Sequence, residues 1–139
     1  MSKISLALLA LLLAGTAPAR AAEPFGLWAT EDGESKIKIT PCGQKLCGTL
    51  AWLKEPNDAA GKPLLDANNT SPALRSRPLL GVPLLQGLTR DGESWKGKIY
   101  NPEDGKTYDG SLTLSGAGKA ELKGCVAVVF CQSDVLVRQ

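Results

Sequence analysis

The 139-residue chain contains no histidine. Without an imidazole it lacks the general base of the Ser-His-Asp and Cys-His arrangements that activate a nucleophile. The usual zinc ligand sets of hydrolases are excluded for the same reason. The phosphate-binding, dinucleotide-binding and calcium-binding loop motifs are also missing from the sequence. We therefore expect no metal and no cofactor.

A hydrophobic run long enough to cross a bilayer is also missing. A run of uncharged and mostly apolar residues covers residues 4–15, well short of the roughly 20 residues that a transmembrane helix needs. It follows Lys3 and precedes Ala-Arg-Ala at residues 19–21, a small-x-small cleavage pattern. We therefore interpret residues 1–21 as a secretory signal peptide and residues 22–139 as one domain. The protein is expected to be periplasmic or secreted, with no stable membrane anchor.

The chain also lacks an excess of one charge. It has 16 basic and 14 acidic residues, and loss of the signal peptide removes Lys3 and Arg20. The remaining chain is formally neutral, so it produces no strong field for nucleic acid or an anionic membrane. Nucleic acid is therefore not an expected partner.

Four cysteines are present, all beyond the signal peptide. An even number in an exported chain indicates two disulfides. Of the three possible pairings we favour the local one, Cys42 with Cys47 and Cys125 with Cys131. Zinc is the alternative, but both spacings are longer than C-x2-C and the chain offers no histidine.

The first cysteine pair predicts a β-hairpin. If Cys42 faces Cys47, residues 43–46 form a four-residue loop and Ile37 lies opposite Trp52. One face of this hairpin is then apolar and the other largely polar, as a sheet with one side on a core requires.

A long irregular segment follows. Prolines and glycines recur through residues 55–77, so no long helix fits there. Ser71-Pro72 is expected to start one helical turn that ends at Arg75. Loops of this length in a compact domain are usually functional lids or disordered.

A second hairpin is predicted around the turn at residues 101–105, where proline and glycine occupy typical turn positions. Ile99 then faces Tyr108, and Gly97 faces Gly110 on the inner side. Two opposed glycines indicate either a bend of the barrel or interior space for a ligand, and we favour the bend.

Counting strand patterns gives eight candidates, at residues 25–30, 35–41, 48–53, 78–88, 94–100, 107–114, 119–126 and 131–138. In the last pair, a Cys125–Cys131 disulfide places Leu122 opposite Asp134, a less regular alternation that indicates a bulge or another pairing. Short strands joined in order by mostly tight turns predict an all-β, eight-stranded antiparallel up-and-down barrel with one long loop.

Four runs of the chain resemble a known family: GLWATEDGESKIKITPCGQKLCGTLAWLKEP, SRPLLGVPLL, WKGKIYNPEDGKTYDGSL and GCVAVVFCQS. In these runs the chain is similar to a bacterial family of exported proteins, domain of unknown function 2147. The resemblance implies a lipocalin-like, ligand-holding barrel over nearly the whole mature chain. The family has no agreed activity.

The resemblance also implies a barrel-closing contact. In lipocalin-like barrels a G-x-W motif near the start packs against an arginine of the last strand, and Gly26, Trp28 and Arg138 match that pattern. The implied cation–π contact is structural rather than catalytic. Family members usually end in W-x-R, whereas this chain has leucine at position 136.

The barrel predicts a binding protein for a small apolar or amphipathic ligand. The expected apolar lining is Ile37, Ile39, Leu50, Trp52, Trp95, Ile99 and Tyr108. In addition, Arg75 and Arg77 of the long loop are candidates to meet an anionic head group, although solvated or loop-stapling roles are the more common ones for such arginines. Eight strands are just wide enough to fill themselves or to hold one small ligand.

Two other functions are open. In the first, the barrel is filled and displays residues 55–77 as an envelope protein–protein interaction module. In the second, carboxylates act as acid and base on a ligand, but Glu103, Asp104 and Asp109 lie in or beside a tight turn, where solvated turn roles are more common. Nothing in the sequence indicates catalysis.

Overall fold

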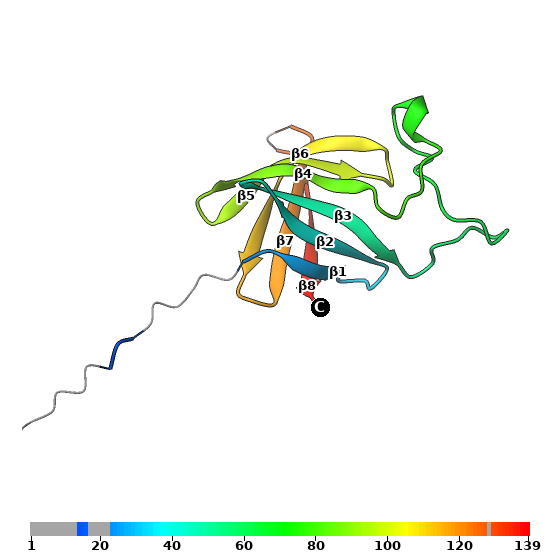
Figure 1. Cartoon of the computed structure of the whole chain (residues 1–139). Helices are drawn as coiled ribbons and strands as arrows, with labels where there is room; N and C mark the ends of the chain where they lie inside the picture. The colour runs from blue at the N-terminus through cyan, green and yellow to red at the C-terminus, as the bar shows by residue number, and fades with distance from the viewer. Residues whose placement is uncertain (1–13, 17–22, 128) are drawn as a thin grey trace, which may run out of the picture.

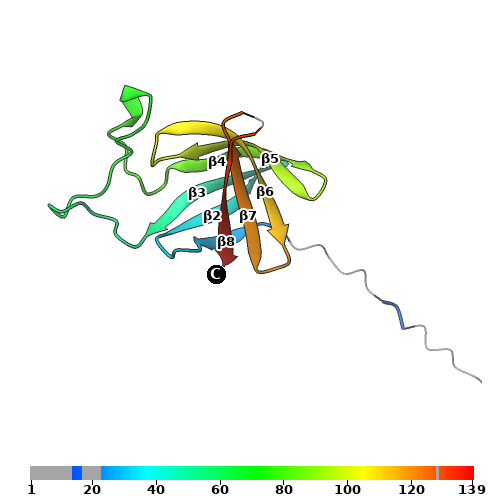
Figure 2. The same ribbon diagram turned by 180° about the vertical axis from the view of Figure 1, so that it is seen from behind.

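A computed structural model describes residues 14–16, 23–127 and 129–139. Its eight strands form a closed antiparallel barrel in which each strand pairs with its sequence neighbours and the last with the first (Figures 1 and 2). The predicted barrel is confirmed. Apart from residues 14–16, the predicted signal peptide lies outside the described residues. The strands are β1 (Gly26–Thr30), β2 (Ser35–Cys42), β3 (Lys45–Leu53), β4 (Pro83–Asp91), β5 (Ser94–Asn101), β6 (Lys106–Ser115), β7 (Lys119–Cys125) and β8 (Cys131–Arg138).

Alternating apolar side chains point into the barrel, because successive residues of a strand face opposite sides of the sheet. The buried core comprises Trp28, Ile37, Ile39, Leu46, Leu50, Val82, Leu84, Leu85, Leu88, Ile99, Tyr100, Leu112, Ala120 and Leu136. Every strand contributes to it, so the core is continuous around the barrel.

The β2–β3 hairpin turns over two residues instead of the expected four. Cys42 lies opposite Lys45, with Gly43 and Gln44 between them. Gly43 has a φ of 66°, which suits the first position of a two-residue hairpin turn. The Cys42–Cys47 disulfide therefore joins diagonal neighbours, with 5.8 Å between their Cα atoms. The expected register is wrong by two residues, an even shift that leaves the same side chains facing inward.

Trp52 was expected on the inner face, and this prediction is wrong. Ile37 lies opposite Leu50, whereas Lys36 lies opposite Trp52, so Ala51 is an extra residue in β3. Such a bulge reverses the alternation beyond it. The Trp52 side chain is 41% exposed, and the Lys36 Nζ lies 4.9 Å from its ring centroid on the outer surface.

The second hairpin has the predicted register, with Ile99 opposite Tyr108 and Gly97 opposite Gly110. The glycine pair does not enclose free space. A Cβ atom on Gly110 would lie 2.3 Å from both the Ile99 Cδ1 and the Lys123 carbonyl oxygen, and one on Gly97 would lie 2.8 Å from the side chain of Leu88. These two glycines therefore permit close packing inside the barrel.

Between β3 and β4 the long segment includes one 3-10 turn, η1 (Pro72–Leu74), where a helical turn was expected. This segment projects from one end of the barrel (green in Figure 1). β4 begins at Pro83 instead of residue 78, because the chain turns at residues 79–82, where the Val82 amide donates to the Leu79 carbonyl.

The last two strands pair without a bulge. Cys125 and Cys131 lie directly opposite one another and form the second disulfide. Leu122 does lie opposite Asp134. The bulge or different pairing expected here is therefore absent. What changes along β8 is the polarity of the side chains on the inner face, from leucine to aspartate.

Candidate functional site

A cavity of about 1180 Å³ opens at one end of the barrel. Its rim is formed by the β1–β2, β5–β6 and β7–β8 connections and by the long segment between β3 and β4. In an up-and-down barrel alternate connections lie at the same end, which brings these four together. The opening is thus built from segments that are far apart in the sequence.

The floor of the cavity is apolar. Its deepest side chains come from six different strands and are aliphatic, so an apolar body placed there would exclude water from hydrocarbon surface on all sides. They are Ile37, Leu50, Leu84, Ile99, Leu122 and Leu136.

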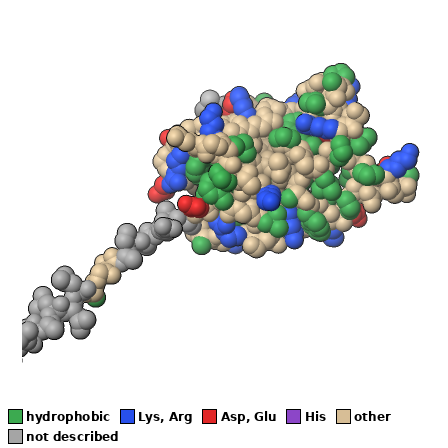
Figure 3. Space-filling view, in the orientation of Figure 1, with side chains coloured by type: hydrophobic (Ala, Val, Ile, Leu, Met, Phe, Trp, Pro, Cys, Tyr) green, Lys and Arg blue, Asp and Glu red, His purple; other side chains and the backbone are tan. Residues whose placement is uncertain are grey.

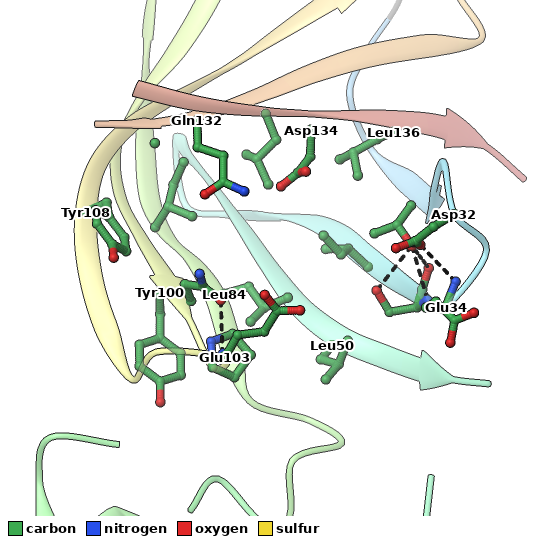
Figure 4. Close-up of a pocket in the computed structure, with 18 of the residues that line it drawn as sticks. Asp32, Glu34, Leu50, Leu84, Tyr100, Glu103, Tyr108, Gln132, Asp134 and Leu136 are labelled. Atoms are coloured by element: carbon green, nitrogen blue, oxygen red, sulfur yellow. Dashed lines mark hydrogen bonds between the residues drawn. The ribbon is translucent and has the colours of Figure 1, made fainter. Parts of the chain in front are cut away.

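Toward the opening the lining becomes polar. On β8, Leu136, Asp134 and Gln132 follow one another at every second position and point into the cavity (Figure 4). Leu136 is buried at the floor, whereas Asp134 and Gln132 are exposed to the cavity. The opposition of Leu122 and Asp134 noted in the sequence therefore marks the boundary between floor and opening.

All charged side chains that line the cavity are acidic: Glu31, Asp32, Glu34, Glu103 and Asp134. No lysine or arginine of the described residues lines it. The Thr30 hydroxyl donates to Asp32 at 2.6 Å, the Glu34 amide donates to it at 3.0 Å, and these bonds lower the pKa of Asp32. The opening therefore carries negative charge on several sides.

Beside the cavity, a buried carboxylate holds the long segment on the barrel. Asp66 is 1% exposed. Its Oδ1 accepts from the Tyr100 hydroxyl at 2.5 Å, and its Oδ2 accepts from Asn69 Nδ2 and from Arg77, each at 2.9 Å. Tyr100 follows Ile99 on β5. Its buried side chain belongs to the core cluster and also lines the cavity, next to the long segment.

In this network the pKa values of Asp66 and Tyr100 are shifted in opposite directions. Burial raises the pKa of Asp66, but the hydrogen bonds from Tyr100, Asn69 and Arg77 outweigh it, and the net pKa is lowered. Burial and the bond to the Asp66 carboxylate raise the pKa of Tyr100 to about 12. Every buried polar side-chain atom among the described residues has a partner. The network therefore acts as a satisfied structural anchor.

A second contact fixes the same segment to the β5–β6 turn. Asn68 Nδ2 donates to the Glu103 carbonyl at 3.0 Å. Gly105 lies so close that a Cβ atom there would be 1.6 Å from the Asn68 carbonyl oxygen. The long segment is thus part of the wall of the opening.

Of the five residues expected to bind a ligand, only Tyr108 lines the cavity. Its hydroxyl donates to Asp104, and this bond, with a smaller effect of burial, raises the pKa of Tyr108. Trp95 faces inward as expected but at the opposite end, where its ring packs on Phe25 with centroids 6.4 Å apart. Trp52 lies outside, as described above.

The two arginines do not lie where a ligand head group was expected. Arg75 donates from Nε to the Asn69 carbonyl at 2.7 Å. Arg77 binds Asp66, and its guanidinium lies 5.8 Å from the Tyr100 ring centroid. Both arginines therefore hold the long segment in place, Arg75 through the Asn69 carbonyl and Arg77 through Asp66. No local pattern in the sequence pointed to Asp66 as the partner of Arg77.

The closed end has the contact that the resemblance implied. Arg138 lies opposite Trp28, with its guanidinium 4.4 Å from the indole centroid. The same guanidinium donates to the carbonyls of Glu23, Phe25 and Ala117 at 2.5–2.7 Å. Arg138 thereby ties the segment before β1 across the base of the barrel.

The remaining acidic candidates are turn and surface residues. Asp104 accepts from the Lys106 amide at 2.9 Å within the turn. Asp109 faces outward and pairs with Lys98. In the described part of the chain, no three His, Cys, Asp or Glu side chains come together in a way that could hold a metal ion. Nor does this part contain a helix with the length and apolar character needed to cross a membrane.

Comparisons with known proteins agree with this architecture. No curated protein matches the sequence. A solved structure from the human pathogen Helicobacter pylori, described as belonging to the lipocalin family, is similar with a TM-score of 0.72. The likeness covers 86% of this chain and 84% of that one at 24% identity, and it concerns the fold.

A family model described as "uncharacterized protein conserved in bacteria" matches residues 26–138. The matched span runs from the first residue of β1 to the last of β8. The chain therefore belongs to this bacterial family, domain of unknown function 2147, and its barrel has the lipocalin fold.

Proposed function

We propose that this protein is an exported binding protein that holds one small apolar or amphipathic molecule in the open end of its barrel. The observation that carries the proposal is the cavity itself, with its aliphatic floor and its polar rim. Ligand sites are typically concave, mostly apolar and equipped with a few polar groups that orient the ligand. No catalytic step is part of this proposal.

Export is part of the proposal. Both disulfides join cysteines within the barrel, and such bonds persist in oxidising compartments. Together with the signal peptide expected at residues 1–21, they support a mature protein of residues 22–139 in the periplasm or outside the cell. Ligand capture would then take place beyond the inner membrane.

The size of the cavity fits a single small molecule. Typical ligand pockets have volumes of about 300–1,000 Å³, and this one, at about 1180 Å³, includes the wide opening. An elongated molecule with its apolar part on the floor and its polar end at the rim would use both kinds of lining.

Filling the cavity tests the proposal. Leu122 is half-buried and lines the cavity, so Leu122→Trp should obstruct it. We expect binding of the neutral fluorescent probe N-phenylnaphthylamine to weaken by about tenfold, the equivalent of about 1.4 kcal/mol. The matched control is Leu80→Trp, because Leu80 is 43% exposed and does not line the cavity.

Equal probe affinity in the two variants would contradict the proposal. Native mass spectrometry of protein exported in oxidised form gives a second measurement. An excess mass that is lost on denaturation and recovered as one compound would identify the natural ligand.

The alternative, an interaction module, is favoured by one observation. The long segment exposes apolar side chains at Leu65, Leu74 and Leu80. Recovery of the protein without a small molecule, but cross-linked to one envelope protein through this segment, would favour the alternative. Its expected filled core, however, does not fit the open cavity.

A further inference from the structure

We infer that the ligand of this cavity is a cationic amphiphile, a molecule with an apolar body and an amine or quaternary ammonium group. This inference rests on the proposed function and adds the charge of the ligand to it. It is based on the charge of the cavity lining: five carboxylates line the cavity, and no basic side chain of the described residues does.

The carboxylates surround the opening and do not form one surface cluster. Glu31, Asp32 and Glu34 come from the β1–β2 turn, Glu103 from the β5–β6 turn and Asp134 from β8. In Figure 4, Asp134 and Glu103 point into the space between these elements from different walls. A cation at the opening would therefore meet carboxylates from more than one direction.

Four of the five carboxylates form no ion pair within the described part of the chain. Glu34 pairs with Lys54 at 3.4 Å, but both side chains are more than half exposed. Among the described residues, the Asp134 and Glu103 side chains form neither an ion pair nor a hydrogen bond. Their charge remains to be balanced by water or by a ligand.

Lys54 pairs with Glu34 at the opening, but the two arginines of the long segment are bound to groups outside the cavity lining. Arg77 is bound to the buried Asp66, and Arg75 to the Asn69 carbonyl. On the face shown in Figure 3, lysine and arginine side chains lie over the outer surface of the barrel and on the projecting segment. The cavity therefore differs in charge from the rest of this near-neutral chain.

The change from an apolar floor to a polar opening indicates how the ligand would be oriented. The aliphatic floor suits a hydrocarbon body, and Asp134 stands two residues from the buried Leu136 on the same face of β8. The half-buried Tyr108 offers an aromatic ring near the opening, and such rings attract quaternary ammonium groups. The positive group would thus lie at the rim, close to Asp134 and Glu103.

The test compares three ligands with the same dodecyl chain: dodecyltrimethylammonium, dodecanol and dodecanoate. The measurement is the displacement of N-phenylnaphthylamine by each ligand, with the two ionic compounds kept below their critical micelle concentrations and dodecanol below its solubility limit. The wild-type protein should bind the cation about tenfold more tightly than the alcohol, since each exposed charge pair adds a modest attraction and several carboxylates act together. Dodecanoate should bind most weakly, and added salt should reduce the differences.

The double variant Asp134→Asn/Glu103→Gln should reduce the preference for the cation to about twofold or less, because both charges at the rim are lost. The control Asp109→Asn/Glu121→Gln removes the same charge from exposed residues that do not line the cavity, and should keep the wild-type preference.

The outcomes separate the two proposals. If dodecanol or dodecanoate binds as tightly as the cation, or if the double variant keeps the preference, the charge assignment is wrong and cavity binding stands. If neither the fluorescent probe nor any dodecyl ligand binds wild-type protein, the proposed function fails as well.

Discussion

Asp66 shows how much one side chain can decide in this protein. It lies in the long segment, is almost fully buried, and receives hydrogen bonds from Tyr100, Asn69 and Arg77. A buried carboxylate without these partners would be strongly unfavourable. With them, it joins the segment to β5 and to the edge of the cavity.

The network should give the protein a defined dependence on alkaline pH. The tyrosine pKa is about 10 in an unfolded chain and about 12 at Tyr100 in the folded protein. Because the folded pKa is raised, the stabilisation is complete below pH 10 and is lost as the pH rises through 12. We expect a loss of about 2–3 kcal/mol in unfolding free energy across this window.

Chemical denaturation of wild type and Tyr100→Phe at several pH values measures this effect. The variant should be less stable by about 1–3 kcal/mol at neutral pH, because Asp66 loses a hydrogen bond. Its alkaline loss should be smaller than that of the wild type. Parallel pH profiles would show that Tyr100 does not titrate with folding.

At acid pH the network should lose stability as the pH falls. The pKa of Asp66 is lowered in the folded protein. Its contribution is therefore present above the unfolded value of about 3.9 and is lost as the pH falls through the lower folded value. Tyr100→Phe should shift this loss toward higher pH, since it removes one bond that favours the carboxylate.

At the scale of elements, the paired glycines of β5 and β6 set how closely the strands pack. Ile99 and the Lys123 carbonyl occupy the space where a Gly110 side chain would lie. A barrel closes only where strands bend, and glycine permits this bend. The opposed glycines let neighbouring side chains and backbone pack closely at this point. The bend expected from the sequence stays a prediction.

Gly110→Ala should lower the unfolding free energy by about 1–3 kcal/mol through overpacking. Denaturant unfolding measures the change, and Gly118→Ala is the control. Gly118 lies in the β6–β7 turn, and a Cβ atom there meets nothing within 4 Å. Similar stability for the two variants would mean that the strands move apart easily at Gly110.

The disulfides belong to the same scale. Each closes a short stretch of chain, with sequence separations of 5 and 6. In the chain-entropy model such short closures stabilise by about 2 kcal/mol each. Each disulfide fixes the turn end of one hairpin. The stability of the whole barrel depends mainly on its buried core.

For the whole molecule, the two ends of the barrel have different roles. Trp28, Phe25 and Trp95 fill one end, and Arg138 binds three backbone carbonyls across it. The other end is open and acidic. Stability and binding should therefore be separable by mutation.

Arg138→Lys tests this separation. Lysine keeps the positive charge near Trp28 but lacks the planar guanidinium that reaches several carbonyls. We expect a loss of about 1.5–3 kcal/mol in unfolding free energy and faster amide exchange before β1. Probe affinity at the open end should be unchanged.

The control is Arg90→Lys. Arg90 also lies over a tryptophan, with 5.5 Å to the Trp95 centroid, but among the described residues it donates to one carbonyl, that of Gly92. It should change stability little. If Arg138→Lys weakened probe binding as strongly as it lowered stability, the two ends would be coupled.

The sequence by itself determined the barrel. Strand alternation, the turn at residues 101–105 and the cysteine spacing are local signals, and they predicted the β5–β6 register, both disulfides and the order of the strands. The G-x-W motif and Arg138 came from the family resemblance, and their contact is present. These features depend on residues that are close in the chain or on a pattern shared by related proteins.

Only the tertiary structure decided which side chains face the cavity. One extra residue in β3 places Trp52 on the outer surface. The packing of the long segment on the barrel brings Arg77 into an ion pair with Asp66. Asp134 lines the cavity because β8 passes the open end at that point. Bulges and loop docking depend on contacts between distant segments, so no local pattern in the chain encodes them.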